Sequence, residues 1–287
     1  MAGPRTRLLH LSDLHFGSRG EDHLASGLAQ LIERLDPELV IASGDLTHRG
    51  RPDQHDRAAD FLQSLGPPVL AVPGNHDIPY TPLARFTRTY EQFERRWQTT
   101  EPVHASEHLH VVGLNSVRPW RHQSGGIRAA QIRRAGDLLT QAKPGALKVV
   151  VLHHHLLGAP WRTRKKPVGN RSGVLAGLVD AGAELILAGH IHQAAVSERH
   201  EFEVVAHEIR GATVAIAPGL GQPRPNRRGE ARGFLVYESE EDALSVHTYI
   251  WREDDWGLTA IRRFPRGRKP LVAQPSPAAS ELSTSGP

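Results

Sequence analysis

The sequence predicts an α/β protein. Two features of the 287-residue chain support this prediction. Short apolar runs typical of buried strands alternate with stretches of helical periodicity as far as about Gly189. Polar motifs follow where several of these runs end, and open α/β sheets place their binding sites just past the carboxyl ends of strands. We therefore expect the motifs to lie at the sheet edge where these strands end.

Five apolar runs are expected to be strands, because each is short and is followed at once by polar or turn-forming residues. They are Leu8–Leu11, Leu39–Ala42, Val69–Val72, Val149–Leu152 and Leu185–Ala188. Two further segments have the spacing of core-facing helices, with aliphatic side chains on one face. They are Glu21–Leu35 and Arg128–Gln141.

The chain changes character after Gln193, where strand-like runs follow one another without helical stretches between them. We expect these runs to form a second sheet. They are Phe202–Ala206, Thr213–Ala217, Phe234–Tyr237 and Leu244–Ile250. The final segment is rich in Pro, Ser and Ala and can bury little apolar surface. We therefore expect one domain over residues 1–264 and a disordered tail over 265–287.

Composition is that of a soluble enzyme, with 39% hydrophobic and 23% charged residues. No apolar run approaches the ~20 residues needed to cross a bilayer. Arg5 and Arg7 lead straight into the first strand, which leaves no signal-peptide core. We expect a cytoplasmic protein without membrane contact. The chain has no cysteine, which excludes disulfides and thiolate metal ligands.

Five polar motifs offer carboxylate, amide and imidazole groups, enough to hold two divalent ions. They are Asp13-Leu14-His15, Gly44-Asp45, Gly74-Asn75-His76-Asp77, His153-His154-His155 and Gly189-His190-Ile191-His192. Side chains two apart on an extended backbone point the same way, so Asp13 and His15 can face one ion. Asp45 stands alone on its loop and is the natural bridge between two ions.

This ligand set indicates a dinuclear metal-dependent phosphoesterase. Two ions set ~3.5–4 Å apart activate a water and clamp the oxygens of a phosphate ester. Mixed oxygen and nitrogen ligands suit Mn²⁺, Fe²⁺/Fe³⁺, Zn²⁺ or Co²⁺.

Each motif alone has an ordinary structural explanation, such as a turn or a surface loop. Five in a fixed order, each at a strand end, argue against coincidence. Other histidines carry less information: we expect His10, inside the first strand, to be packed or hydrogen-bonded. His48 is a weaker candidate for substrate contact. For His154 and His155, two roles remain equally compatible with the sequence: support of the metal ligands, or an ordinary place in the loop.

The order of these motifs resembles that of the calcineurin-like metallophosphoesterases, and most closely the class III cyclic nucleotide phosphodiesterases. The resemblance covers about Leu8 to Tyr237, most of the chain. It also includes Leu9-His10-Leu11-Ser12-Asp13-Leu14-His15-Phe16, Ser43-Gly44-Asp45-Leu46-Thr47, Val112-Gly113-Leu114-Asn115-Ser116 and the segment Gly126-Ile127…Gln131-Ile132. It implies a two-sheet β-sandwich flanked by helices.

Carried over position by position, the resemblance implies the role of each site residue. Asp13, His15 and His192 resemble the ligands of one ion, and Asn75, His153 and His190 those of the second. Asp45 resembles the bridging ligand. His76 resembles the catalytic histidine beside the leaving group, and Asp77 resembles the group that orients it.

Two positions depart from the family pattern. The family commonly has prolines after the histidine pair, where this chain has His155-Leu156-Leu157. This departure leaves the choice between His153 and His154 as the ligand open, with His153 preferred because it follows the strand directly. Class III members tend to carry Asp where Asn115 stands.

Three functions are compatible with the sequence. The first is hydrolysis of cyclic nucleotides or similar small phosphodiesters, by in-line attack of a metal-bridging hydroxide with His76 assisting the leaving group. The second is a nuclease acting on DNA or RNA, because repair exonucleases of this superfamily begin with a similar Leu-Ser-Asp-x-His-type motif. The basic stretches Arg162–Arg171 and Arg224–Arg232 could attract a phosphorylated substrate, whereas Arg262–Lys269 at the start of the tail reflects solubility or weak contact with polyanions. The third is a non-catalytic binding module, which the retained His76 and the full set of ligand candidates disfavour. The sequence does not indicate the oligomeric state.

Overall fold

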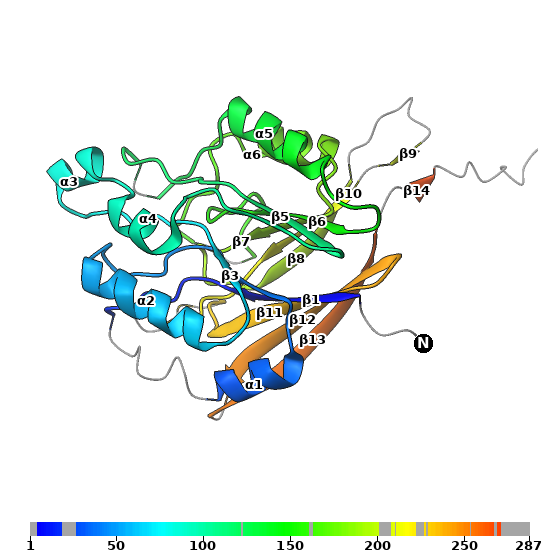
Figure 1. The fold of residues 1–287 in the computed structure, drawn as a ribbon, viewed down its shortest axis with the longest axis horizontal. Coiled ribbons are helices and arrows are strands. Elements are labelled where there is room, and N and C mark those ends of the chain that lie inside the picture. Colours follow the sequence, from blue (N-terminus) through cyan, green and yellow to red (C-terminus); the bar gives the residue numbers. More distant parts are fainter. Residues whose placement is uncertain are drawn as a thin grey trace, which may run out of the picture.

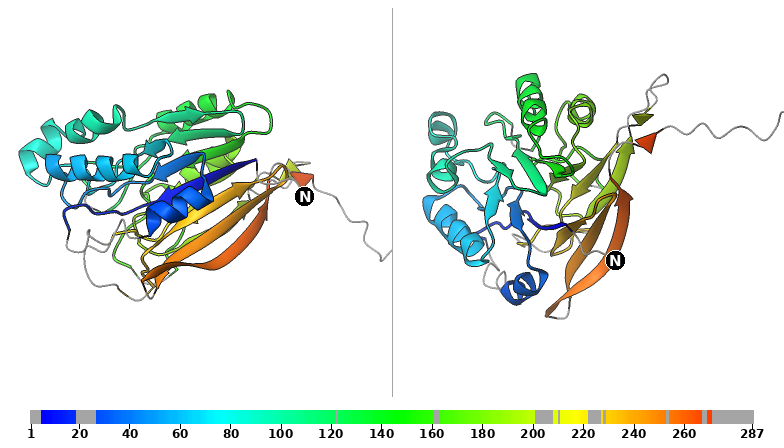
Figure 2. Two further views of the ribbon diagram at one scale, coloured as in Figure 1. Left: turned by 60° about the horizontal axis from the view of Figure 1, so that its bottom comes forward. Right: turned by 45° about the vertical axis from the view of Figure 1, so that its right-hand side comes forward.

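The computed structural model describes residues 5–18, 27–121, 123–160, 163–200, 208–209, 211–221, 227, 229–252, 254–266 and 269–270. Two six-stranded sheets pack face to face, and helices cover their outer faces (Figures 1 and 2). The predicted α/β fold, a two-sheet sandwich flanked by helices, is confirmed. No helix in the described part of the chain is long and apolar enough to cross a membrane.

The first sheet joins strands from the two halves of the chain in the order β13-β12-β11-β1-β2-β3. Strands β1, β2 and β3 run parallel, and β11, β12 and β13 form an antiparallel extension beside β1. The bounds are β1 Thr6–Leu11, β2 Leu39–Ala42, β3 Val69–Ala71, β11 Gly233–Ser239, β12 Ala243–Arg252 and β13 Asp255–Pro265.

The second sheet has the order β4-β5-β6-β7-β10-β8, with β5, β6, β7 and β10 parallel. The bounds are β4 Val103–Ala105, β5 Leu109–Gly113, β6 Leu147–Val151, β7 Leu185–Ala188, β8 Ala195–His200 and β10 Gly211–Ile216. A separate short pair joins β9 Glu208–Ile209 to β14 Lys269–Pro270.

Six helices are described. Their bounds are α1 Leu28–Leu35, α2 Pro52–Ser64, α3 Pro82–Thr87, α4 Glu91–Trp97, α5 Ala129–Leu139 and α6 Arg171–Asp180. Helices α5 and α6 lie on the outer side of the second sheet, and α2 lies on the side of the first (Figures 1 and 2).

The core between the sheets follows from the alternation of side chains along each strand. Leu8 and Ile41 of the first sheet pack with Val149 and Leu187 of the second, and all four are fully buried. This layer holds the two sheets in a fixed relation, which positions the loops at their carboxyl ends.

The opposite faces of the same strands pack against helices. Leu9 and Val40 contact a cluster that includes Ile32 of α1 and Leu62 of α2. On the second sheet, Val150 belongs to a cluster with side chains from α5 and α6. Because both faces of the central strands are buried, these strands read as continuous apolar runs.

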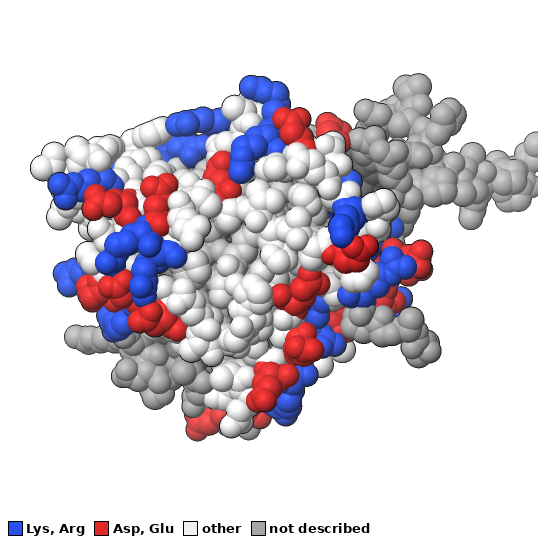
Figure 3. Space-filling model, in the orientation of Figure 1, with Lys and Arg blue, Asp and Glu red and all other residues white. Residues whose placement is uncertain are grey.

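Charged side chains of both signs are interspersed over α2 and α4, and the middle of the face shown in Figure 3 carries few. Several of them pair between the two helices. Arg95 of α4 lies 2.6 Å from a carboxylate oxygen of Asp56 on α2, and Arg96 pairs with Asp60. The charges of these helices are therefore largely balanced by pairing.

The five predicted strands occur with ends that differ by at most two residues from the predicted ones. Of the predicted helix Glu21–Leu35, α1 covers the last eight residues, and residues 21–26 lie outside the described part. The predicted helix Arg128–Gln141 corresponds to α5.

The prediction that the runs after Gln193 form a sheet of their own is wrong. β11 and β12 extend the sheet of β1, whereas β10 joins β7 in the other sheet. The cause is long-range pairing, which local sequence does not encode: Leu9 pairs with Val236, and Ile186 pairs with Val214. The run Phe202–Ala206 lies outside the described residues.

Ordered structure continues past the predicted domain end at residue 264. Both guanidinium Nε and Nη2 of Arg266 contact the Glu184 carboxylate at 3.1 Å, and Nη1 donates to the hydroxyl of Ser239 at 2.8 Å. The Arg266 side chain is 6% exposed. We propose that the domain extends at least to Arg266. The rest of the predicted tail, apart from β14, lies outside the described residues.

Arg266→Ala is expected to lower the free energy of unfolding by about 2–3 kcal/mol, because it leaves the part-buried Glu184 carboxylate without its bidentate partner. Arg263→Ala is the matched control. Arg263 pairs with Glu240 on the exposed surface, and loss of such a pair costs less than about 1 kcal/mol. Urea unfolding of the two variants measures the difference; equal stabilities would contradict a structural role for Arg266.

Candidate metal centre

The five polar motifs meet where the carboxyl ends of the two sheets come together. Three of them follow β1, β2 and β3 of the first sheet, and two follow β6 and β7 of the second. The seven residues predicted to bind metal are all buried, none more than 5% exposed. They are Asp13, His15, Asp45, Asn75, His153, His190 and His192. The structure therefore brings every predicted ligand to one enclosed place.

Five of these ligands have backbone conformations that residues with side chains rarely adopt. Asp13, His15, Asp45, His190 and His192 have φ between 53° and 77°, among eight such non-glycine residues in the described chain. This left-handed conformation costs roughly 1–2 kcal/mol per residue. Strain of this kind persists where surrounding structure enforces it, and it concentrates at functional sites.

Hydrogen bonds between loops enforce these conformations. The backbone N–H of Asp13 donates to the carbonyl of Gly44 at 2.9 Å, and that of His15 donates to the carbonyl of Asp45 at 2.9 Å. The loops after β1 and β2 thus continue the pairing of their strands. This pairing carries the carboxylates of Asp13 and Asp45 to the same place.

Two glycines allow the backbone to approach the ligands closely. A Cβ on Gly74 would lie 2.3 Å from Oδ1 of Asp45, and a Cβ on Gly189 would lie 1.8 Å from Oγ of Ser12. Neither contact is possible for a residue with a side chain. The glycines in these motifs are therefore required by packing.

The first ligand group contains Asp13, His15 and His192. Oδ1 of Asp13 lies 3.0 Å from Nε2 of His192 and 3.8 Å from Nε2 of His15, and the two Nε2 atoms are 3.1 Å apart. The other oxygen, Oδ2, accepts hydrogen bonds from the Ser12 hydroxyl at 2.7 Å and from the backbone N–H of His190 at 2.8 Å. Oδ1 is thereby directed toward the two imidazoles.

The second group contains Asp45, His153 and His190. Nδ1 of His153 donates to the carbonyl of Ser43 at 2.8 Å, which leaves Nε2 facing Asp45 Oδ1 at 3.3 Å. Nε2 of His190 donates to the carbonyl of Gln123 at 3.1 Å, which leaves its Nδ1 directed inward. Such bonds on the far nitrogen fix the tautomer of metal-binding histidines.

Asp45 links the two groups. Its Oδ1 lies beside His153 of the second group, and its Oδ2 lies 3.9 Å from Nε2 of His15 in the first. The carboxylate therefore has the position of a bridging ligand.

Several ligand atoms in the site are buried and have no hydrogen-bond partner. They are Oδ1 of Asp13, Oδ2 of Asp45, Oδ1 of Asn75, Nε2 of His153 and Nδ1 of His190. A buried polar atom without a hydrogen-bond partner costs about 1–3 kcal/mol. Several such atoms close together therefore indicate that a bound group interacts with them. Carboxylate, amide and imidazole groups arranged in this way fit two divalent cations, one in each group.

The pKa values of Asp45 and His153 agree with a metal site at this place. Burial opposes ionisation of the Asp45 carboxyl, but the nearby His153, His76 and His15 together outweigh burial and hold its pKa well below the ordinary value. Burial also acts to lower the pKa of His153, and the adjacent Asp45 reverses this effect and raises it to about 9. A metal ion would replace the proton that the pair holds.

His76 lies at the edge of this centre and is half-buried. Its ring meets that of His15 edge-on, with centroids 4.9 Å apart. Nδ1 lies 2.8 Å from the carbonyl oxygen of His48 and 2.8 Å from the hydroxyl of Tyr80. Nδ1–H donates to this carbonyl, which leaves Nε2 for a substrate.

Asp77 does not take the role that the resemblance implied. Its Oδ1 accepts hydrogen bonds from the backbone N–H and the hydroxyl of Thr47 at 2.8 and 3.0 Å, and its Oδ2 accepts from the N–H of Gly74 at 2.8 Å. The carboxylate thus holds together the loops that carry Asp45 and Asn75. The groups within hydrogen-bond distance of the His76 imidazole are instead the His48 carbonyl and the Tyr80 hydroxyl.

The three adjacent histidines have different surroundings. Among the described residues, His153 is the member of the three that joins a candidate metal group. Nδ1 of His154 contacts the hydroxyl of Ser116 at 2.8 Å, and its ring packs on His190. His155 also stacks on the ring of His190. The geometry favours His153 as the ligand and gives the other two a supporting position.

Other residues at the centre were partly or wholly missed by sequence reasoning. Nζ of Lys165 donates to the carbonyl of His190 and lies 3.9 Å from Oδ1 of Asp13. It lay within a predicted basic stretch without being singled out. Tyr80 gave no sequence signal beyond its position four residues after His76. His10 is buried and hydrogen-bonded to Tyr237 and Ser43, as predicted.

A comparison with protein families gives a match to the calcineurin-like phosphoesterase model over residues 6–194. This range contains all five motifs. The chain belongs to the calcineurin-like phosphoesterase family. The predicted resemblance is confirmed, and with it the assignment to the metallophosphoesterases as a class of hydrolase.

Curated relatives in this family are similar over much of the chain. A probable cyclic nucleotide phosphodiesterase of Synechococcus is 30% identical over 175 residues, which cover 58% of this chain and 63% of that protein. The 3′,5′-cyclic adenosine monophosphate phosphodiesterase of Haemophilus influenzae is 27% identical, over 71% of this chain and 76% of that protein. The match thus spans less than two thirds of the Synechococcus protein.

Solved structures share the fold at low sequence identity. A dimetal phosphatase from Danio rerio has a TM-score of 0.59 at 15% identity, covering 92% of this chain and all of that one. Purple acid phosphatase from yellow lupin seeds has a TM-score of 0.65 at 13% identity, covering 90% of this chain and 53% of that one.

Asp45→Ala is expected to abolish hydrolysis and to lower the content of both metals, because each ion loses a ligand. Metal analysis of the purified variant, with Asp60→Ala on the exposed face of α2 as the control, measures this loss. Full metal content with normal turnover in Asp45→Ala would exclude a bridging role.

His153→Ala is expected to lower activity far more than His155→Ala. The first change removes a ligand, whereas the second removes a ring that stacks on His190. Turnover and metal content, compared at equal fractions of folded protein, measure the difference. Equal losses in the two variants would contradict the choice of His153.

Proposed function

We propose that this chain is a dinuclear metal-dependent phosphodiesterase that hydrolyses small phosphodiesters, cyclic nucleotides among them. The observation that carries the proposal is the position of Asp45 between two adjacent ligand groups, each with buried atoms that lack hydrogen-bond partners. The curated relatives named as cyclic nucleotide phosphodiesterases support the choice of substrate.

In this proposal Asp13, His15 and His192 hold one ion, and Asn75, His153 and His190 hold the other, with Asp45 between them. Bound ions of this kind lower the pKa of a water and neutralise the charge on phosphate oxygens. The metals are drawn from Mn²⁺, Fe²⁺/Fe³⁺, Zn²⁺ and Co²⁺, which this mixture of ligands suits.

The protein's own groups handle the leaving oxygen. His76 Nδ1–H is held by the His48 carbonyl oxygen, so Nε2 can donate a proton or a hydrogen bond to the departing oxygen. Tyr80 contacts the same Nδ1 and fixes the ring from the outer side. Lys165, whose Nζ lies near Asp13, adds positive charge beside the reacting phosphate.

A pocket of about 440 Å³ beside His76 has the size of a small-molecule site. Tyr80, which contacts His76, lines it together with Arg49 and Arg88. Tyr80 therefore connects this pocket with His76.

Three described arginines of the later basic stretches make contacts within the chain, which disfavours the nuclease alternative. The guanidinium of Arg232 lies over the ring of Trp251 at 4.7 Å. Arg263 and Arg266 pair with Glu240 and Glu184. Arg232 and Arg266 are thus engaged within the fold and offer little for a nucleic-acid backbone.

Rates of hydrolysis with Mn²⁺ test the proposal directly. Bis-p-nitrophenyl phosphate and 3′,5′-cyclic AMP are expected to be hydrolysed faster than p-nitrophenyl phosphate, and single-stranded DNA slowest. Preference for the monoester would contradict the assignment to phosphodiesters, and preference for DNA would favour a nuclease.

His76→Ala is expected to keep both metals and lose about 10²–10⁴-fold in turnover on cyclic AMP, whose leaving group is a ribose hydroxyl that needs a proton. The loss is expected to shrink on bis-p-nitrophenyl phosphate, because p-nitrophenolate leaves without protonation. Tyr80→Phe is expected to give a smaller loss of turnover, again larger on cyclic AMP than on bis-p-nitrophenyl phosphate. Equal losses of His76→Ala on both esters would mean that His76 acts in another way, such as positioning the phosphate.

A further inference from the structure

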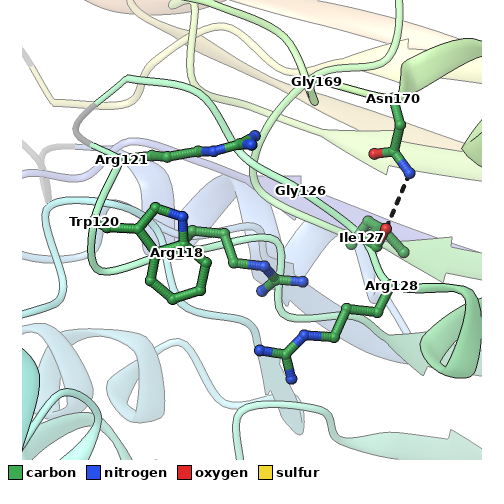
Figure 4. A pocket seen from close by; sticks show the side chains of 8 residues that line it. All are labelled: Arg118, Trp120, Arg121, Gly126, Ile127, Arg128, Gly169 and Asn170. Carbon is green, nitrogen blue, oxygen red and sulfur yellow. Dashed lines mark hydrogen bonds between the residues drawn. The ribbon is translucent and has the colours of Figure 1, made fainter.

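A second pocket lies between the loop of residues 118–128 and the segment that leads into α6 (Figure 4). Its volume is about 490 Å³. The residues that line it are Arg118, Trp120, Arg121, Gly126, Ile127, Arg128, Gly169 and Asn170. None of them is a candidate metal ligand, and the proposed phosphodiesterase reaction uses none of them.

Three guanidinium groups face this pocket. Figure 4 shows Arg118, Arg121 and Arg128 around the same space. In the part of the chain that the structure describes, none of the three forms an ion pair with a carboxylate. Burial lowers the pKa of Arg118, and the positive charge of Arg128 lowers it further, whereas Tyr90 and Glu101 act in the opposite direction. Several positive charges close together are stabilised by an anion.

Arg118 is held in place before any ligand arrives. It is 9% exposed, and its Nη1 donates to the carbonyls of Val117 at 2.7 Å and Asn115 at 3.2 Å. Its Nη2 donates to Oε1 of Gln131 at 2.7 Å. A guanidinium fixed in this way loses little conformational freedom when it binds a ligand.

Glycines keep the space between the guanidiniums open. A Cβ on Gly126 would lie 3.6 Å from Nε of Arg118 and 3.8 Å from Nη1 of Arg121. A Cβ on Gly169 would lie 3.0 Å from the same Nη1. A larger side chain at residue 126 would therefore extend toward the place where an anion would contact both arginines, without clashing with the backbone.

Two helices also begin at this pocket. Arg128 and Asn170, which line it, are the residues immediately before α5 and α6. The Asn170 side chain donates to the carbonyl of Ile127 at 3.0 Å and does not cap α6. The first turns of helices carry N–H groups that the helix does not satisfy, and their positive ends favour anions.

Trp120 adds an aromatic surface to the same pocket. Its side chain is 61% exposed, one of the more exposed large apolar groups in the described chain. An exposed indole beside arginines offers a surface for a planar base, and stacking of this kind contributes about 1–3 kcal/mol.

We propose that this pocket binds a nucleoside phosphate, with the phosphate on Arg118, Arg121 and Arg128 and the base on Trp120. The proposal does not depend on the phosphodiesterase activity, because the ligand contacts neither metal group. One loop nevertheless contributes to both sites, because the loop that carries Arg118, Arg121 and Arg128 also supplies the Gln123 carbonyl that contacts His190.

Calorimetric titration of the metal-loaded full chain with AMP tests the proposal. Arg128→Gln and Gly126→Leu are expected to weaken AMP binding at least about tenfold, because the first removes a charged hydrogen-bond donor and the second fills the anion position. Trp120→Ala is expected to weaken AMP at least about fivefold and to leave inorganic phosphate unchanged. Arg133→Gln, on the exposed side of α5, is the matched control and is expected to match wild type.

The metal centre can also hold a phosphate, so the two sites are separated with Asp45→Asn. AMP binding that persists in Asp45→Asn and falls in Arg128→Gln places the ligand in this pocket. Binding lost in Asp45→Asn and unchanged in Arg128→Gln would assign it to the metal centre and overturn the proposal. If Asp45→Asn does not fold, wild type titrated with and without a chelator gives the same comparison.

Two probes test the chemistry of the ligand. Adenosine is expected to bind at least about tenfold more weakly than AMP, since it lacks the charged group. Adenosine binding as tightly as AMP would overturn the anion site, and inorganic phosphate binding as tightly as AMP would overturn the nucleotide assignment. Absence of saturable AMP binding to wild type would overturn the proposal altogether.

Discussion

The buried carboxylate of Asp45 is the constraint on which the centre of this fold depends. It accepts a hydrogen bond from the backbone N–H of His76, faces His153 from the other sheet and approaches His15 from the first. A fully buried anion is tolerated only with such compensation. The loops after β1, β2, β3 and β6 must therefore all reach one point, where bound cations would stabilise so many polar atoms close together.

The sequence alone placed the candidate ligands near one another, because each motif follows a strand directly. Strand ends are set locally, by a run of apolar residues that stops at Gly or a polar residue. Pairing between strands is not local: β1 receives β11 on one side and β2 on the other, and one of these partners is more than 200 residues away. This is why the predicted strands were right and their division between the two sheets was wrong.

The difference between local and long-range structure also explains why sequence reasoning assigned Asp77 to His76 and overlooked Tyr80. The resemblance pointed to the adjacent Asp77, but Asp77 turns to Thr47 and Gly74, whose backbone groups are brought to it by β2 and β3. Tyr80, four residues after His76, reaches the imidazole with its hydroxyl. Likewise, runs of basic residues were conspicuous in the sequence, whereas Arg118, Arg121 and Arg128 are spaced along a loop and become a cluster only in the fold.

The left-handed backbone at the ligands has a consequence for how this family can diverge. At Asp13, His15, Asp45, His190 and His192, glycine would adopt the same conformation without strain. A descendant that no longer needed catalysis would gain stability by such exchanges, since each removes a ligand and a steric penalty together. In this chain the side chains at all five positions are thus present at a cost in backbone strain that glycine would avoid.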